Sequence, residues 1–402
     1  MAASLGWMLD AFDVMLFALV LKSIMTDLKV DPAGAGLLQS VTLLAAAAGG
    51  LIFGIIADRW GRTRALMFSI FLYSVFTAAC GLATSALALG VFRVCLGLGM
   101  GGEWASGAAL VSETWPDRDR GKALGFVQSS WAIGYALAAV TSWVVQDIAG
   151  LSWRVVFFVG ILPAFLTFWI RRRVPEPEVW RKTKAGSAGV PAGVLPFSNS
   201  PDGTPALPGL FLITCALTLM NGFTMFAWWG LNNWVPSFLR SSTSGGIGLS
   251  NTAMTGFLIA MQAGMWLGYI TFGYLSDRIG RKRCYVIYLL IAAVSVLTYA
   301  WSAKPFLLLL LGPMVAFFGT GYFSGFGAVT AEIYPTGIRA TAQGLTYNLG
   351  RIASAAAPWL VGSMIKTSGY PAALSLASAA FVLAAVCWLF IPETKGKLHT
   401  ES

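Results

Sequence analysis

Charged residues are scarce in this chain of 402 residues, at 11% against 57% hydrophobic residues. A soluble surface cannot be built from so few charges, which excludes a soluble multidomain protein. The single histidine, His399, lies near the carboxyl end, so histidine cannot carry protons inside an apolar run. The five cysteines lie within apolar runs and have no Cys-x-x-Cys spacing, so neither a disulfide framework nor a metal site is indicated.

Apolar runs of about 20 residues recur along the whole chain, and each is long enough to cross a bilayer as a helix. The pattern therefore predicts an all-α membrane protein with twelve transmembrane helices. We place them at residues 2–22, 34–57, 65–84, 86–112, 122–146, 153–171, 209–239, 250–276, 284–302, 305–331, 341–365 and 371–391.

Basic residues are distributed unevenly between the two sides of these spans. With both termini on one side, that side receives 19 of the 27 Lys and Arg residues, and the other receives six. The positive-inside rule then puts both termini in the cytoplasm of a multi-pass protein of the cell membrane, the inner membrane in a bacterium. These clusters account for the net charge of +10, and we expect the lipid bilayer rather than nucleic acid as partner.

The segment 172–208 is the longest polar stretch and holds seven of the 17 prolines. Its composition is typical of a flexible linker without a fold of its own. We therefore divide the chain into a six-helix bundle over 1–171, a cytoplasmic linker over 172–208, and a second six-helix bundle with a short tail over 209–402. No cleavable signal peptide is visible, and the missing basic lead before the first helix predicts a truncated or misassigned start.

Two motifs recur between the halves at one offset of 219 residues. The first is Gly54-x-x-Ala57-Asp58-Arg59-x-Gly61-Arg62-x-Arg64, which recurs as Gly273-x-x-Ser276-Asp277-Arg278-x-Gly280-Arg281-x-Arg283. The second is Glu113-Thr-Trp-Pro116 with Arg120, which recurs as Glu332-Ile-Tyr-Pro335 with Arg339. Each motif alone could be a charge cluster that sets topology, but the shared offset predicts two bundles related by a pseudo-twofold axis.

These repeated residues predict a lock on the cytoplasmic side. We expect Gly54 and Gly273 to allow close packing of neighbouring helices. An aspartate at a helix end is expected to accept a hydrogen bond from an arginine. Contacts that form only when the bundles meet would bias one conformation of a rocking pair. The predicted gate comprises Gly54, Asp58, Arg59, Arg62, Glu113, Arg120, Gly273, Asp277, Arg278, Arg281, Glu332 and Arg339, with Glu113–Arg120 and Glu332–Arg339 as partners.

The doubled motifs resemble those of the major facilitator superfamily, and the resemblance covers the whole chain. Within it, Gly6-Trp-Met-Leu-Asp-Ala-Phe-Asp13, Gly99-Met-Gly-Gly-Glu-Trp104 and Trp153-Arg-Val-Val-Phe-Phe-Val-Gly160 resemble the sialate:proton symporters and their carboxylate-carrying relatives. The resemblance implies two six-helix bundles and transport coupled to protons.

Five charged residues lie well inside predicted spans, away from their ends: Asp10, Asp13, Arg93, Glu103 and Arg351. Charges in hydrocarbon cost at least about 2.5 to 3.5 kcal/mol on insertion scales, so each is a functional candidate. Asp10 and Asp13 share a helix face and cannot both ionise cheaply, so one is expected to hold a proton. Glu103 suits proton handling or a structural hydrogen bond equally, and static pairing remains the alternative for both aspartates.

The Ala-Phe-Asp13 setting resembles helix 1 of proton-coupled sugar porters, whose helix 4 arginine matches Arg93 through its Arg-x-x-x-Gly context. This resemblance implies that Asp13 carries the proton and that Arg93 is its counter-ion in one conformation.

The second half offers one intramembrane cation, Arg351, with Tyr347 and Asn348 nearby on the same predicted helix. The planar guanidinium of Arg351 can bind a carboxylate through two parallel hydrogen bonds. Arg351 is therefore either the site for a substrate anion or the partner of an acid in the first half. The remaining substrate candidates are Asn232, Trp229 and Tyr322, although aromatic residues in membrane helices more often meet lipid or core.

Together these features predict a functional monomer that takes up a small organic anion, a sialate, monocarboxylate or aromatic acid, with protons. Symport of an uncharged sugar or polyol, drug:proton antiport, and a sensor that transports nothing are the alternatives. We expect no enzyme activity, cofactor or metal, since the glycine-rich stretch of helix 4 lacks the Lys-Ser/Thr of a phosphate-binding loop.

Overall fold

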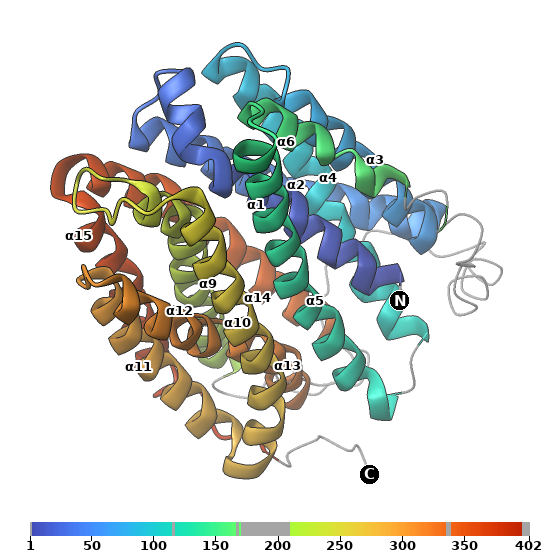
Figure 1. Ribbon diagram of the computed structural model, residues 1–402. Helices are drawn as coiled ribbons and strands as arrows, with labels where there is room; N and C mark the ends of the chain where they lie inside the picture. The colour runs from blue at the N-terminus through green and yellow to red at the C-terminus, as the bar shows by residue number, and fades with distance from the viewer. Residues whose placement is uncertain (1, 115–116, 166–168, 170–209, 335–338, 396–402) are drawn as a thin grey trace, which may run out of the picture.

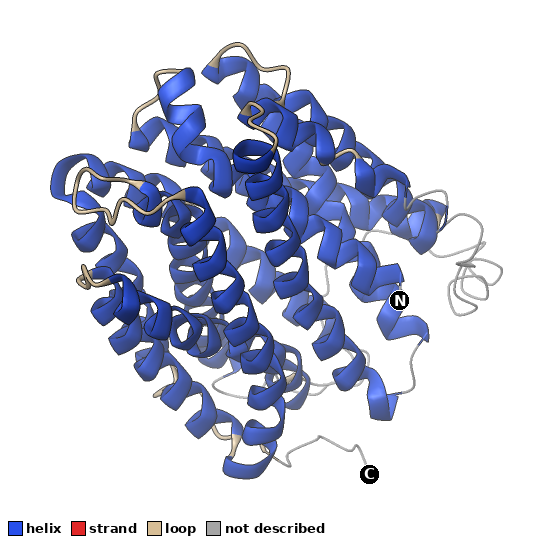
Figure 2. Ribbon diagram, in the orientation of Figure 1, coloured by secondary structure: helices blue, strands red, loops and turns tan. Residues whose placement is uncertain are grey.

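The computed structural model describes residues 2–114, 117–165, 169, 210–334 and 339–395, and within these only the backbone of 2–3, 58, 62, 104–114, 117–125 and 339–341. The described part of the chain is helical, and Figure 2 shows no strand in it. The predicted linker 172–208 lies outside the described residues.

The first half forms one group of packed helices. Its elements are α1 (Ala2–Asp27), α2 (Pro32–Trp60), α3 (Arg62–Cys80), α4 (Ala86–Thr114), α5 (Asp117–Trp143), a π-helical turn (Val144–Ile148) and α6 (Trp153–Val159). Asp31 caps α2 by accepting from the backbone N–H of Gly34 at 2.8 Å, and Pro32 begins that helix. Between α2 and α3, Gly61 adopts a φ of 117°, a conformation that side chains with a Cβ rarely adopt.

The second half repeats this arrangement. Its elements are α9 (Leu210–Arg240), α10 (Asn251–Ile279), α11 (Arg281–Ala300), α12 (Pro305–Thr320), a 3₁₀ turn (Gly321–Gly325), α13 (Phe326–Ile333), α14 (Arg339–Ser354) and α15 (Ala357–Cys387). Gly280 between α10 and α11 has a φ of 102°, which matches Gly61 in the first half. The turn glycine of the repeated motif thus serves the same purpose twice.

Each of the twelve predicted spans corresponds to helical structure among the described residues. The tenth span is divided into α12, the 3₁₀ turn and α13, and the last two spans are joined in α15 across a kink at Gly369, whose φ is 80°. By length and composition alone, eight helices of the described chain are apolar enough to cross a membrane. The predicted all-α, twelve-helix fold is confirmed, although several helices are interrupted.

The two halves lie side by side, and among the described residues their most extensive contacts are α2 against α15, α5 against α10, and α1 against α9 (Figure 1). We call the face at which α1 begins and α15 ends the terminal face. The opposite face, which carries the loops 28–31, 149–152 and 241–250, is the distal face.

The halves are joined closely at the distal face. Lys22 donates to the backbone oxygen of Arg240 at 2.7 Å, and Lys366 pairs with Asp31 at 2.9 Å. The backbone N–H of Gly34 and the Lys366 ammonium hold the pKa of Asp31 below its usual value, so this pair persists at neutral pH and is lost as the pH falls through that lowered pKa. Further along the α5–α10 contact, Trp143 donates to Thr252, and Asn251 donates to Asp147.

The terminal face is packed less closely at the repeated glycines. A Cβ added at Gly54 or Gly273 would meet no described atom within 4 Å. The predicted close packing at these two glycines is therefore wrong for this conformation, because no described atom of a neighbouring helix approaches α2 or α10 there. Among the described residues, close contacts between the halves at the distal face and the lack of any at Gly54 and Gly273 correspond to a state that opens toward the termini.

Replacing Gly362 with leucine should block closure of the distal face. A Cβ at Gly362 would lie 2.7 Å from Trp234 Cζ2 and 3.0 Å from the carbonyl carbon of Pro32, so α15 could no longer approach α2. We expect labelling of an introduced cysteine on the distal face to rise several-fold and substrate transport to be lost. Gly256→Leu is the matched control, since Gly256 is exposed and a Cβ there meets nothing within 4 Å.

If Gly362→Leu labels and transports as the parent protein does, the α2–α15 contact does not govern closure. Asp31→Asn should have a much smaller effect than Gly362→Leu, because exposed ion pairs contribute only about 0 to 1 kcal/mol.

Candidate functional site

Three buried carboxylates lie beside one another, two on α1 and one on the neighbouring helix α4. Glu103 of α4 packs against Gly6, where a Cβ would lie 2.5 Å from its Oε1 atom, and Asp10 lies one turn further along α1. Asp13 follows three residues later, about 4.5 Å along the helix axis. The three side chains are 1 to 2% exposed and close enough for their charges to interact. The structure thus brings together the three acids that the sequence singled out.

These carboxylates have few hydrogen-bond partners among the described residues. Asp13 Oδ2 accepts from the Thr77 hydroxyl at 3.2 Å, whereas both carboxylate oxygens of Asp10 and the Oε2 atom of Glu103 have no partner. The buried Tyr73 hydroxyl beside them also lacks one. An unpaired ionised carboxylate is very costly in such a setting, and a bound proton is the simplest way to neutralise it.

Arg93 lies beyond this acid cluster and not against Asp13. Its guanidinium donates to the backbone oxygen of Leu38 at 3.3 Å and to Gln39 Oε1, and it covers the Phe17 ring at 3.7 Å from the centroid. Because Phe17 follows Asp13 by four residues, Arg93 sits about 6 Å further toward the distal face. The Asp13–Arg93 ion pair is absent from this conformation, so their pairing stays a prediction for another one.

Arg351 of α14 faces the acids from the second half. Its side chain is 5% exposed, and no hydrogen bond or ion pair to its guanidinium is found among the described residues. It lies close enough to Asp10 for the two charges to interact, and Tyr347 is near both. A buried cation and a buried carboxylate therefore face each other across the bundles without a direct hydrogen bond.

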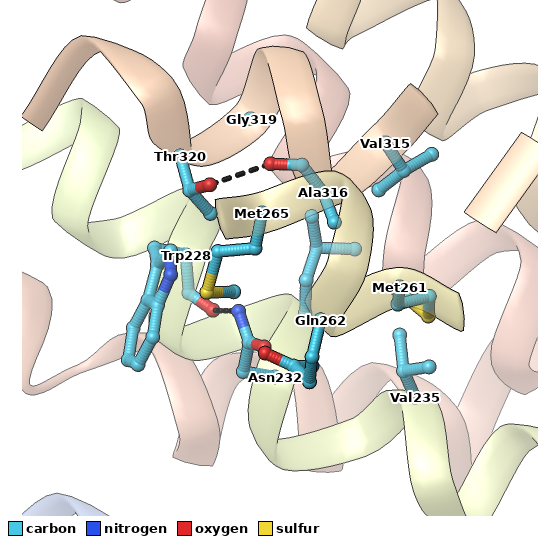
Figure 3. Close-up of a pocket in the computed structure, with 11 residues that line it drawn as sticks. Trp228, Asn232, Val235, Met261, Gln262, Met265, Val315, Ala316, Gly319 and Thr320 are labelled. Carbon is cyan, nitrogen blue, oxygen red and sulfur yellow. Dashed lines mark hydrogen bonds between the residues drawn. The ribbon is translucent and has the colours of Figure 1, made fainter. Parts of the chain in front are cut away.

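A small pocket with a mainly apolar lining lies in the second half, between α9, α10 and α12. Figure 3 shows Asn232 and Gln262 among its lining residues, with the Asn232 amide donating to the backbone oxygen of Trp228 at 2.9 Å. Gln262 is 3% exposed, and its Oε1 atom has no partner among the described residues. The cavity is about 20 Å³, room for about one water molecule, so the site is nearly closed here.

The other predicted substrate residues are placed differently from one another. Trp229 is buried against Trp228, with ring centroids 4.7 Å apart. Tyr322 lies in the core of the second half, where its hydroxyl donates to the backbone oxygen of Thr224 at 3.4 Å. Asn348 is half-buried and donates to the backbone oxygen of Gly344. Of these three, Trp229 alone adjoins the pocket through its neighbour.

The ion pairs that the structure describes in the predicted gate lie in the second half. Arg281 pairs with Asp277 at 2.5 Å and with Glu332 at 3.1 Å, and it donates to the Ser276 hydroxyl at 2.7 Å. Thr394 donates to the second oxygen of Glu332 at 2.5 Å. All these residues belong to the second half, so the expectation that such contacts form only between the bundles is wrong for this network.

Arg281 is the arginine that the structure describes beside Glu332, and the predicted Glu332–Arg339 pair stays a prediction. The side chains of Arg339, Asp58, Arg62, Glu113 and Arg120 lie outside the described residues. Arg59 and Arg278 are exposed at the terminal face.

The segment after α15 packs against the ion-pair network of Arg281. The Glu393 carboxylate accepts from the backbone N–H of Arg281 at 2.8 Å and of Lys282 at 3.2 Å, at the beginning of α11. Burial acts to raise the pKa of Glu393, but the backbone donors of Lys395, Arg281, Thr394 and Lys282 outweigh it and hold that pKa below its usual value. Glu393 therefore stays charged at neutral pH and caps α11.

Arg281→Ala should destabilise the second half. The change leaves Glu332, whose side chain is 11% exposed, without its cation, so we expect a loss of about 1 to 3 kcal/mol. The measurement is the thermal unfolding midpoint of the purified protein, with Arg278→Ala as control because Arg278 is an exposed arginine three residues away. Equal midpoints for the two variants would contradict a stabilising role for the Arg281 network.

Sequence reasoning missed three polar residues that complete the site: Gln39 beside Arg93, Thr77 beside Asp13, and Gln262 in the pocket. Each is a polar side chain inside an apolar run, and this is the signal that could have identified them. Within the described residues, no group of three or more His, Cys, Asp or Glu side chains could hold a metal ion.

Comparison with known proteins agrees with the architecture. The chain matches the family model described as Major Facilitator Superfamily over residues 3–270 and 217–402. It is 31% identical to a cis,cis-muconate transport protein of Acinetobacter baylyi, covering 97% of this chain and 93% of that one. It is also 31% identical to the sialic acid transporter NanX of Escherichia coli, covering 94% and 90%.

Among solved structures, a D-xylose-proton symporter superposes with a TM-score of 0.78 at 19% identity, covering 98% of both chains. At this identity the likeness concerns the fold alone. It shows that the arrangement of two helical bundles recurs in a solved transporter structure.

Proposed function

We propose, since this chain belongs to the Major Facilitator Superfamily, that it takes up a small organic anion together with a proton by alternating access. As a member of that family it is a multi-pass membrane transporter and not an enzyme. The substrate would be a sialate, a monocarboxylate or an aromatic acid. The printed names of two relatives, a muconate and a sialic acid transporter, support this range.

The observation that carries the proposal is the buried pair of Arg351 and Asp10. The Arg351 guanidinium has no described hydrogen bond, and neither oxygen of Asp10 has one. A buried arginine whose N–H groups have no protein acceptor can bind a carboxylate ligand through bidentate hydrogen bonds.

The acid cluster would supply the coupling. When a substrate carboxylate binds Arg351, the attraction between Arg351 and Asp10 weakens, and the acid cluster gains by binding a proton. Asp13 would carry this proton, Asp10 and Glu103 would form its path, and Arg93 would pair with the ionised Asp13 after the bundles rock. Protonation and substrate binding would then favour the same conformation.

We place the termini and the linker 172–208 in the cytoplasm, between bundles 1–171 and 209–402, and the distal face outside. The excess of Lys and Arg on the terminal side supports this orientation. In a bacterium this means the inner membrane. A single chain contains both bundles and the site between them, which supports a functional monomer.

Uptake into proteoliposomes tests the proposal. Purified protein is reconstituted, and accumulation of radiolabelled sialate, lactate and benzoate is followed with and without an inward pH gradient. We expect at least one acid to accumulate above its outside concentration only when the gradient is present. Accumulation of none of these acids, or accumulation that ignores the gradient, would reject proton-coupled anion uptake.

Uptake of an uncharged sugar or polyol is the second candidate. The amides of Asn232 and Gln262 line one pocket, and amides can both donate to and accept from hydroxyl groups. Labelled xylose and mannitol in the same assay distinguish the two candidates.

A further inference from the structure

Three indole rings from three helices meet where the halves join. Trp7 of α1 contacts Trp131 of α5 with centroids 4.8 Å apart, and Trp131 contacts Trp228 of α9 at 5.4 Å in an edge-to-face arrangement. We call Trp7, Trp131 and Trp228 the indole cluster. Since α5 and α9 belong to different halves, the Trp131–Trp228 contact crosses the interface on which rocking acts.

The indole cluster is buried, yet it leaves polar atoms unused. Trp131 is 4% exposed and Trp228 is 6% exposed, and the ring N–H of each has no acceptor among the described residues. Buried tryptophans usually find a partner for this group, and an unsatisfied buried donor costs free energy. A cluster needed for packing alone would be served better by leucine or phenylalanine. The open donors indicate that a ligand supplies the missing acceptor.

The cluster is in register with the charged residues of the site. Asp10 follows Trp7 by one helical turn, and Asn232 follows Trp228 by one turn. The helices α1, α5 and α9 run in the same direction, because an even number of crossings separates each pair. The indole faces therefore lie about one turn, roughly 5 Å, from the level at which Asp10 faces Arg351.

We infer that the site takes carboxylates whose carbon frame is planar and conjugated, and that Trp131 and Trp228 determine this preference. This inference rests on the proposed function and narrows its substrate class. Arg351 would hold the carboxylate, and the flat frame would insert between the two indoles. In this conformation the rings of Trp131 and Trp228 contact each other. Separation of the two halves would break this contact, and a ligand inserted between the rings would replace it. A saturated, polyhydroxylated acid such as sialate offers no π face to this surface.

Matched pairs of acids isolate the contribution of the π face. Benzoate is compared with cyclohexanecarboxylate, and cis,cis-muconate with its saturated counterpart adipate. N-acetylneuraminate is included as the polyhydroxylated acid. Binding is measured by calorimetry on the purified full-length protein, and tryptophan fluorescence quenching provides a second readout. We expect the conjugated member of each pair to bind about tenfold more tightly, the scale of one favourable aromatic contact.

Variants assign the preference to the cluster. Trp131→Leu should bind both members of a pair equally, whereas Trp131→Phe, which keeps an aromatic face, should retain most of the discrimination. Trp266→Leu is the matched control, because Trp266 is 41% exposed on α10 and should leave discrimination unchanged. If Trp131→Leu does not fold, Trp228→Leu gives the same comparison, because it removes the other aromatic face of the Trp131–Trp228 contact.

The outcomes separate this inference from the proposed function. Equal binding within both pairs, or binding of N-acetylneuraminate alone, would overturn the inference while anion transport stands. Discrimination that survives unchanged in Trp131→Leu would also overturn it, because the preference would then arise elsewhere. If no acid binds and none is accumulated in proteoliposomes, the proposed function fails and this inference fails with it.

Discussion

Asp13→Asn should abolish accumulation driven by a pH gradient while preserving exchange of substrate across the membrane. The amide mimics the protonated carboxyl in shape but cannot release a proton, so both conformations remain accessible without coupling. With one proton per substrate, a gradient of one pH unit corresponds to about 1.4 kcal/mol, or a tenfold accumulation. We expect this ratio to fall to about one in the variant. Uptake against an imposed gradient, and counterflow at equal pH, are the two measurements.

The environment of Asp13 makes this a conservative change. Its Oδ2 atom accepts from the Thr77 hydroxyl, and the corresponding amide oxygen can accept the same bond. Asp10→Asn and Glu103→Gln serve as comparisons, because both residues belong to the same cluster. An Asp13→Asn protein that still accumulates substrate along a pH gradient would refute its role as carrier. The variant of the cluster that then loses accumulation would identify the carrier.

The fold could be predicted because its determinants are local or periodic. Apolar runs long enough to cross a bilayer predict the spans. Gly61 and Gly280 adopt positive φ in the turns between spans, at corresponding positions of the two halves. The offset of 219 residues predicted the two related groups of helices. The interruptions were harder to predict: the 3₁₀ turn at Gly321–Gly325 and the kink at Gly369 depend on how neighbouring helices pack.

The site could be predicted only in part. A charge inside an apolar run is costly wherever it lies, so Asp10, Asp13, Glu103, Arg93 and Arg351 could be identified from their positions alone. Their partners could not be identified in this way, because pairing depends on distances across helices that the sequence does not specify.

Two side chains show this limit. The Arg93 guanidinium contacts the Gln39 amide and the Phe17 ring instead of a carboxylate. Glu332 accepts from Arg281, 51 residues earlier in the chain, although Arg339 is only seven residues away in sequence. The pairing of Glu332 with Arg281 could not be inferred from proximity in the sequence.

Arg351→Ala should lower the affinity for the transported anion by about 10- to 100-fold, the scale of hydrogen bonds to a charged group. Arg351→Lys keeps the charge but loses the planar fork, so a smaller loss, with some transport remaining, is expected. Calorimetry on purified protein measures the affinity, and counterflow measures the remaining transport. Unchanged affinity in both variants would reject Arg351 as the carboxylate site.

A double variant distinguishes the two roles that Arg351 could have. If Arg351 serves mainly as the counter-ion of Asp10, its removal harms the protein by leaving a buried carboxylate without a cation, and Asp10→Asn should then restore affinity in the Arg351→Ala background. If Arg351 binds the substrate, removing the charge of Asp10 cannot replace the lost donors, and affinity should stay low. We expect the second result, because the Arg351 guanidinium makes no described hydrogen bond to Asp10 and its donors remain open to a ligand.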